Sequence, residues 1–336
     1  MVTHATRGFV VLAAAAACAA CDADSDGRHS AGAVSPRLVA AAAGEWEEWY
    51  LPVDGGCSLY VREMGSGPPL LVVHGGWGAE HDYLTDAFHG LESQYRLIFY
   101  DQRGSLRSPC PDSLVSVEQH IADLEALRAE LAIDAPVIIG HSMGTFLAMS
   151  YLERHPHRVG GLVLLGSLVP ATPRDEEELA ISRRQEQAFA EWARAAQERQ
   201  IATEGLDRDD LSAKERTYRW RIGFASGNIY HVDRWRQMMG GMVFYSAEAG
   251  RAAGRTMPGE WDFIPAIRAL SRPVTVINGD HDLVGFGGEL HRRMLQDIPN
   301  VELVILENAG HNAWIDQPER FRQELLRALS KYDQPD

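Results

Sequence analysis

A serine, an aspartate and a histidine each follow an apolar segment of this 336-residue chain. Ser142 lies in Gly-His-Ser-Met-Gly, between the apolar run 136–139 and the mainly apolar segment 145–152. A G-x-S-x-G motif between a buried strand and a helix exposes a serine hydroxyl on a sharp turn as a nucleophile. The same turn places the Met143 amide at a helix N-terminus, where it can donate to a developing oxyanion. The motif therefore predicts acyl transfer through Ser142.

An activated serine needs a base, and the base needs a group that fixes its tautomer and stabilises its charged form. His311 and Asp282 each come shortly after a predicted strand in the C-terminal part of the chain. The order Ser, Asp, His is that of the sheet proteins that carry this motif. We expect Ser142, Asp282 and His311 to be the catalytic residues, with Asp280 as an alternative acid.

A second oxyanion donor is expected in the sequence His-Gly-Gly-Trp-Gly at 74–78, which follows the apolar run 69–73. Glycines there let the backbone approach a substrate closely. We expect the Gly76 amide to donate, with the Trp77 amide as the alternative. The histidine and cysteine spacings do not fit a metal site, so the sequence predicts neither a metal nor a cofactor.

Buried strands alternate with amphipathic helices over 45–170 and 271–336, which predicts an α/β core with a mostly parallel, doubly wound sheet. Between these segments, 171–270 contains no convincing core strand. Its charged helical stretches predict a helical cap over the active site. Methionine and aromatic residues of the cap would either line a pocket or pack within the cap, and they are Trp220, Trp235, Met238, Met239, Met242 and Phe244.

The N-terminus carries a weakly positive start, an apolar run and an abrupt change to polar residues, which predicts an export signal over 1–21. The ending Ala-Ala-Cys21 resembles a bacterial lipoprotein signal, so Cys21 is the expected lipid attachment site; simple cleavage nearby is the alternative. Residues 22–44 read as a flexible tether. Export would place Cys57 and Cys110 in an oxidising compartment, as a disulfide or as two separate buried thiols.

The formal net charge is −15 at pH 7, and the chain lacks clustered Lys and Arg. A nucleic-acid partner is therefore excluded, because phosphate binding needs such a cluster. The expected partner is a small-molecule or short-peptide substrate, with membrane anchoring through a lipid on Cys21. The oligomeric state is left open.

These motifs together resemble the α/β-hydrolase family. The residues 74–78, 81–84 and 101–108 resemble its proline iminopeptidase branch, although Trp77 and Leu106 stand where that branch usually has Pro and Gly. The resemblance implies an α/β-hydrolase fold with an inserted cap, and it favours Asp282, because the family acid lies three residues after a glycine. Aminopeptidases of this branch hold the substrate amine with cap glutamates, and the candidates here are Glu204, Glu215 and Glu248.

The sequence thus predicts an exported serine hydrolase that cleaves a small amide or ester. A proline iminopeptidase-like aminopeptidase and a carboxylesterase would share this apparatus and differ in the cap. The alternative from another class is a catalytically silent binding protein of the same fold. That protein would be expected to lack part of the triad, whereas Ser142, Asp282 and His311 are all present.

Overall fold

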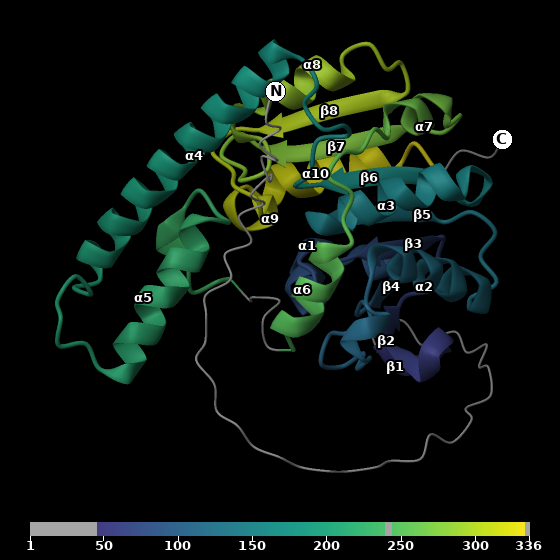
Figure 1. Cartoon of the computed structure of the whole chain (residues 1–336), viewed down its shortest axis with the longest axis horizontal. Coiled ribbons are helices and arrows are strands. Elements are labelled where there is room, and N and C mark those ends of the chain that lie inside the picture. Colours follow the sequence, from purple (N-terminus) through teal and green to yellow (C-terminus); the bar gives the residue numbers. More distant parts are fainter. Residues whose placement is uncertain (1–45, 239–243, 333–336) are drawn as a thin grey trace, which may run out of the picture.

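The computed structural model describes residues 46–238 and 244–332, and its centre is an eight-stranded sheet in the order β1-β2-β4-β3-β5-β6-β7-β8 (Figure 1). The strands are β1 (Glu47–Val53), β2 (Cys57–Met64), β3 (Pro69–Val73), β4 (Arg96–Tyr100), β5 (Val137–His141), β6 (Gly161–Leu165), β7 (Val274–Gly279) and β8 (Val301–Leu306). β2 is antiparallel to β1 and β4, and the other pairings are parallel. The predicted mostly parallel α/β sheet is confirmed.

Both faces of the sheet are covered, which explains why its central strands are continuously apolar. On β3, Leu71 and Val73 belong to the hydrophobic cluster under α2 (Val117–Glu130), α3 (Met143–Arg154) and α7 (Ile264–Ala269). The alternate residues Leu70 and Val72 pack in the cluster on the opposite face. That face is covered by α1 (Thr85–Phe88), α9 (Ala313–Asp316) and α10 (Pro318–Leu329), while α8 (Glu289–Leu295) lies between β7 and β8 in the chain.

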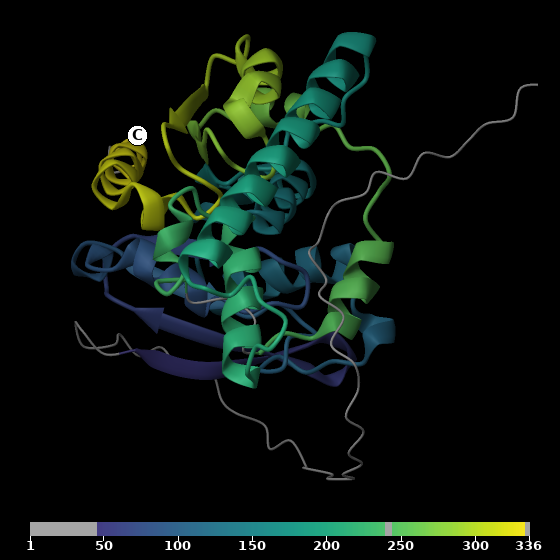
Figure 2. The same ribbon diagram turned by 90° about the vertical axis from the view of Figure 1, so that its left-hand side faces the viewer.

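The chain leaves the sheet after β6 and returns at β7, and the described parts of this excursion form four α-helices. They are α4 (Glu176–Thr203), α5 (Ala213–Ser226), α6 (Ala247–Arg255) and α7, which already belongs to the core. Figure 2 shows α4 and α5 side by side across one side of the core. They share a small hydrophobic cluster that includes Trp235 and Met238, so these two residues pack within the cap.

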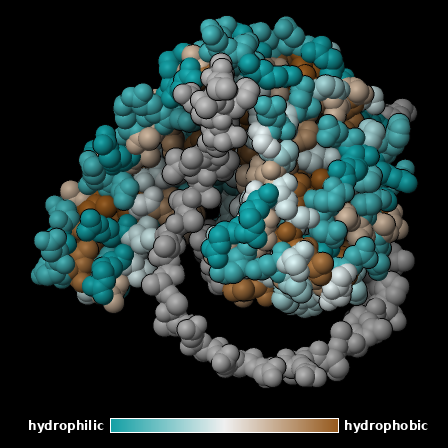
Figure 3. Space-filling model, in the orientation of Figure 1, coloured by the Kyte–Doolittle hydropathy of each residue, from teal (hydrophilic) through white to brown (hydrophobic). Residues whose placement is uncertain are grey.

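The outer surface of α5 is less completely covered. Trp220 is 44% exposed and stacks on Phe224 with ring centroids 5.8 Å apart. Both line a hollow of about 620 Å³ between α4 and α5. Figure 3 shows hydrophobic surface in this part of the cap.

Several sequence predictions fall on residues outside the described parts of the chain: the export signal, Cys21, the tether 22–44, Met239 and Met242. Within 46–238 and 244–332, none of the helices combines the length and the apolar composition needed to cross a membrane.

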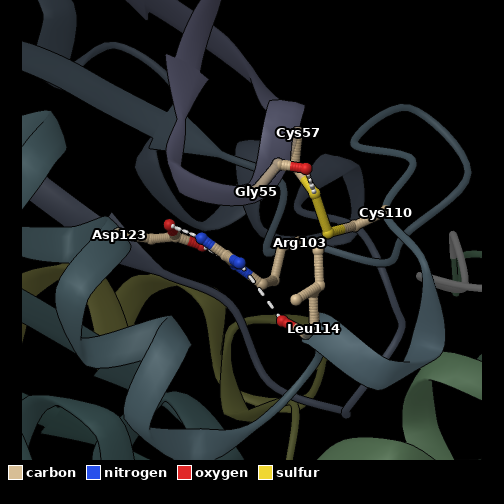
Figure 4. The surroundings of a disulfide bond; sticks show 6 residues. All are labelled: Gly55, Cys57, Arg103, Cys110, Leu114 and Asp123. Atoms are coloured by element: carbon tan, nitrogen blue, oxygen red, sulfur yellow. Dashed lines mark hydrogen bonds and ion pairs between the residues drawn. A yellow bond between two sulfur atoms is a disulfide. The ribbon is translucent and has the colours of Figure 1, made fainter.

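Cys57 and Cys110 form a disulfide with Cα atoms 5.2 Å apart (Figure 4). The bond joins the start of β2 to the long loop that follows β4. Beside it, the buried Arg103 guanidinium donates through Nε to the Asp123 carboxylate of α2 at 2.6 Å and through Nη1 to the Leu114 carbonyl at 3.1 Å. The disulfide thus holds this loop at Cys110, and the buried ion pair holds it at Arg103.

Replacing Cys57 and Cys110 together by alanine should lower the free energy of unfolding by about 2–4 kcal/mol, because the bond closes a long loop in the unfolded chain. Urea unfolding followed by fluorescence measures the change. Reducing the unmodified protein should lower its midpoint toward that of the double variant. An unchanged midpoint after verified reduction would show that the bond contributes no stability.

Candidate active site

Ser142 occupies a strained turn between β5 and α3. Its backbone angles are φ 54° and ψ −125°, a combination that a residue with a side chain rarely adopts. The flanking glycines make the turn possible: a Cβ on Gly140 would lie 2.6 Å from the Gly144 carbonyl oxygen, and one on Gly144 would lie 2.2 Å from the Val73 carbonyl oxygen. The Ser142 amide donates to the Leu165 carbonyl at 3.0 Å, which anchors the turn on β6.

His311 and Asp282 lie in the loops after β8 and β7, at the same edge of the sheet as Ser142. His311 Nδ1 is 2.8 Å from Asp282 Oδ1, and the exposed fractions of the two residues are 4% and 0%. Because the carboxylate accepts from Nδ1–H, His311 Nε2 is the nitrogen free to take a proton. The ring packs on Gly166, next to Leu165, which places it beside the elbow.

Asp280, the alternative acid, has a different environment. Its Oδ1 lies 2.7 Å from Nδ1 of His281 and accepts from the Ala309 amide at 3.2 Å. The side chain at 280 thus organises the loop in front of His311, and the structure places Asp282 against the imidazole.

The loop that carries His311 is held by Asp316, which the sequence analysis did not identify. Its buried carboxylate accepts from the amides of Gly310, Tyr230 and His231 at 2.8, 2.7 and 2.8 Å. Burial raises the pKa of Asp316 even though these amide bonds oppose the change. One side chain thus ties the cap segment 230–231 to the His311 loop. A single acid before a helix resembles an ordinary capping residue, so its sequence carried no signal for this role.

The glycine-rich loop after β3 lies directly against the elbow. A Cβ on Gly75 would be 2.5 Å from Ser142 Cβ, so only glycine fits there. The Gly75 amide already donates to Tyr83 Oη at 2.8 Å. Gly76 follows with φ 71°, a left-handed conformation that suits glycine. The Trp77 indole turns into the core, where it stacks on His120 and donates to Met257 Sδ.

His74, the first residue of this loop, is a neutral structural group. Its Nε2 accepts from the Gln102 amide at 3.0 Å, so Nδ1–H donates to the Gly75 carbonyl at 2.8 Å. Burial lowers the pKa of His74 to about 4. The histidine therefore joins the loop after β3 to the loop after β4.

Asp101, which directly follows β4, is the buried acid of a second network. It accepts from His81 Nδ1 at 2.6 Å and from Arg107 Nε at 2.6 Å, and Arg107 also donates to Asp82. Burial alone would raise the pKa of Asp101, but the hydrogen bonds from His81 and Arg107 lower it to about 2. This network fixes the segment that leads from the glycine-rich loop to α1.

The three cap glutamates considered as amine ligands are engaged elsewhere. Glu204 accepts from both terminal nitrogens of Arg236 at 2.7 and 2.8 Å. Glu215 caps α5 through Ser212 and pairs with Arg208, and Glu248 pairs with Arg251. Each carboxylate thus already has a cationic partner.

Asp101→Asn should lower the free energy of unfolding at pH 7 by about 2 kcal/mol, because the folded-state pKa of about 2 lies below the unfolded value of 3.8. The folded state binds fewer protons between these values, so the stabilisation is complete above about pH 4 and disappears as the pH falls toward 2. Urea unfolding of both proteins at several pH values measures the difference. If the difference in the free energy of unfolding between the two proteins stayed constant down to pH 2, the lowered pKa of Asp101 would be contradicted.

Comparison with known proteins agrees with the fold described above. Residues 68–318 match the family described as alpha/beta hydrolase fold. A proline iminopeptidase of Levilactobacillus brevis is 27% identical over 310 residues, covering 86% of this chain and 98% of the relative. Among solved structures, an esterase from Exiguobacterium antarcticum has a TM-score of 0.62 at 20% identity, covering 84% of this chain and 98% of its own. Proline iminopeptidase from Mycobacterium smegmatis has a TM-score of 0.60 at 20% identity, covering 85% and 99% of the two chains. The chain belongs to the alpha/beta hydrolase fold family and is a hydrolase.

Proposed function

We propose that the protein is a serine hydrolase that works through an acyl-enzyme on Ser142. The observation that carries the proposal is the buried hydrogen bond between His311 and Asp282 beside the strained Ser142 turn. His311 Nε2 takes the proton of the serine hydroxyl as its oxygen attacks the substrate carbonyl. The proton then passes from His311 to the leaving group. A water, activated by the same nitrogen, hydrolyses the acyl-enzyme and regenerates the serine.

Two backbone amides are proposed to hold the oxyanion formed in each step. Met143 is the first residue of α3, so its amide has no acceptor within the helix and belongs to the positive end of the helix dipole. Gly76 supplies the second amide, because the Gly75 amide already donates to Tyr83. Loss of one such donor costs about 3 kcal/mol of transition-state stabilisation.

The substrate class we propose is a small uncharged ester. An aminopeptidase must bind the positive charge of a free amine, and the glutamates 204, 215 and 248 are each paired with an arginine. An ester has no such charge to bind. The second candidate is a prolyl amide, favoured by the relatives described as proline iminopeptidases.

The place of action we propose is outside the cytoplasm. The support is the sequence of 1–21, with its apolar run and Cys21 as the lipid attachment site, together with the Cys57–Cys110 disulfide. The tether 22–44 would then separate the anchor from the folded domain.

Ser142→Ala should reduce ester turnover by about 10⁴-fold or more, because the covalent step is lost while the fold is kept. Ser150→Ala, which removes another buried hydroxyl from α3, is the matched control and should retain activity. Hydrolysis of p-nitrophenyl butyrate measures both variants. Undiminished turnover by a verified Ser142→Ala protein would rule out the proposed mechanism.

Comparing an ester with a prolyl amide tests whether the cap binds a free amine. Because the three glutamates are already paired with arginines, kcat/KM should be higher for p-nitrophenyl butyrate than for proline β-naphthylamide by at least about 10-fold. Each rate is taken as the difference from Ser142→Ala. A higher kcat/KM for the prolyl amide, which disappeared in Glu204→Gln but not in Ser150→Ala, would instead show that the protein is an aminopeptidase.

A further inference from the structure

Two side chains outside the triad connect all three loops of the proposed active site. Tyr83 Oη lies 2.8 Å from the Gly75 amide and 2.7 Å from His141 Nδ1. On its other side, His141 Nε2 lies 3.3 Å from the His311 carbonyl oxygen. The glycine-rich loop, the elbow and the loop of the catalytic histidine are thus joined through one phenol and one imidazole.

The direction of every hydrogen bond in this connection follows from its two ends. A backbone amide can only donate, so Tyr83 Oη accepts from Gly75. A carbonyl can only accept, so His141 Nε2 carries the proton. A neutral imidazole has one N–H, which leaves Nδ1 as an acceptor and makes the Tyr83 hydroxyl its donor.

Both side chains are held in the forms that this arrangement requires. Burial and the neighbouring His311 keep the pKa of His141 well below its ordinary value, so the ring is neutral. Burial also raises the pKa of Tyr83, so its hydroxyl keeps its proton. The two rings contact Trp314, whose centroid is 6.3 Å from that of Tyr83 and 5.1 Å from that of His141.

We propose that Tyr83 and His141 are positioning residues for the reaction, and this inference rests on the proposed function. Tyr83 holds the Gly75 amide, so that the next amide, that of Gly76, stays turned to the oxyanion beside Ser142. His141 sets the position of the His311 backbone and remains uncharged. The His311 ring, 4.6 Å away, is then the one of the two that becomes positive when the serine proton is taken.

Tyr83→Phe removes only the hydroxyl, and Tyr100→Phe is its matched control. Tyr100 is also fully buried, but its hydroxyl has no hydrogen-bond partner in the described parts of the chain. Tyr83→Phe should lower kcat about 10- to 100-fold with KM changed less than about 3-fold, because misplaced catalytic groups affect the transition state more than substrate binding. Tyr100→Phe should retain the kcat of the unmodified protein.

A double-mutant cycle tests the connection itself. Because His141 Nδ1 orients the Tyr83 hydroxyl that holds Gly75, His141→Leu already loosens this contact. Tyr83→Phe combined with His141→Leu should therefore lose less kcat than the product of the two single losses. His141→Asn keeps an acceptor for the Tyr83 hydroxyl and should retain at least several-fold more kcat than His141→Leu. Melting temperatures measured in parallel identify folded variants.

Three results would overturn the inference: a Tyr83→Phe protein with unchanged kcat, losses that multiply in the double variant, or equal kcat for His141→Asn and His141→Leu. Ser142→Ala separates this failure from a failure of the proposed function. If Ser142→Ala is inactive and any of these results is obtained, the serine mechanism stands and the positioning role falls. If Ser142→Ala is active, the proposed function itself is wrong.

Discussion

The structure depends on one local constraint, the close approach of backbone around Ser142. A residue with φ 54° and ψ −125° is costly, and surrounding contacts must hold it. Glycine stands at three positions of close approach: Gly140 and Gly144 flank the turn, and Gly75 lies against the serine Cβ. This packing leaves the Met143 amide at the start of a helix. In the proposed mechanism, the strained turn thus provides both the nucleophile and part of the oxyanion site.

Parallel strands explain how distant residues reach this turn. β3, β5, β7 and β8 run in the same direction, so the loops after them meet at one edge of the sheet. Buried polar contacts then fix these loops relative to one another. His74 joins the glycine-rich loop to the loop after β4, and Asp316 joins the His311 loop to the cap. Each buried polar group satisfies backbone atoms that would otherwise be left unpaired.

The sequence was sufficient for the sheet and for the elbow, because apolar runs and a glycine-flanked serine have direct local causes. It could not choose between Asp280 and Asp282 from residues alone, since two acids two positions apart differ only in the direction that the loop gives their side chains. Asp316 was missed because two of its partners, the amides at 230 and 231, are distant in sequence. The Cys57–Cys110 pairing also depends on a distance that sequence does not encode.

Membership of the family does not identify the substrate, because the substrate class depends on the cap. There Glu204 binds Arg236 and offers no unpaired charge to an amine. The proposed role of Ser142 is the same for an ester and for an amide substrate. Covalent labelling with a fluorophosphonate, followed by peptide mapping, tests it most directly, since the probe reacts with an activated serine. We predict a single adduct on Ser142, formed much more slowly in His311→Ala. Labelling at another residue, or an unchanged rate without His311, would contradict it.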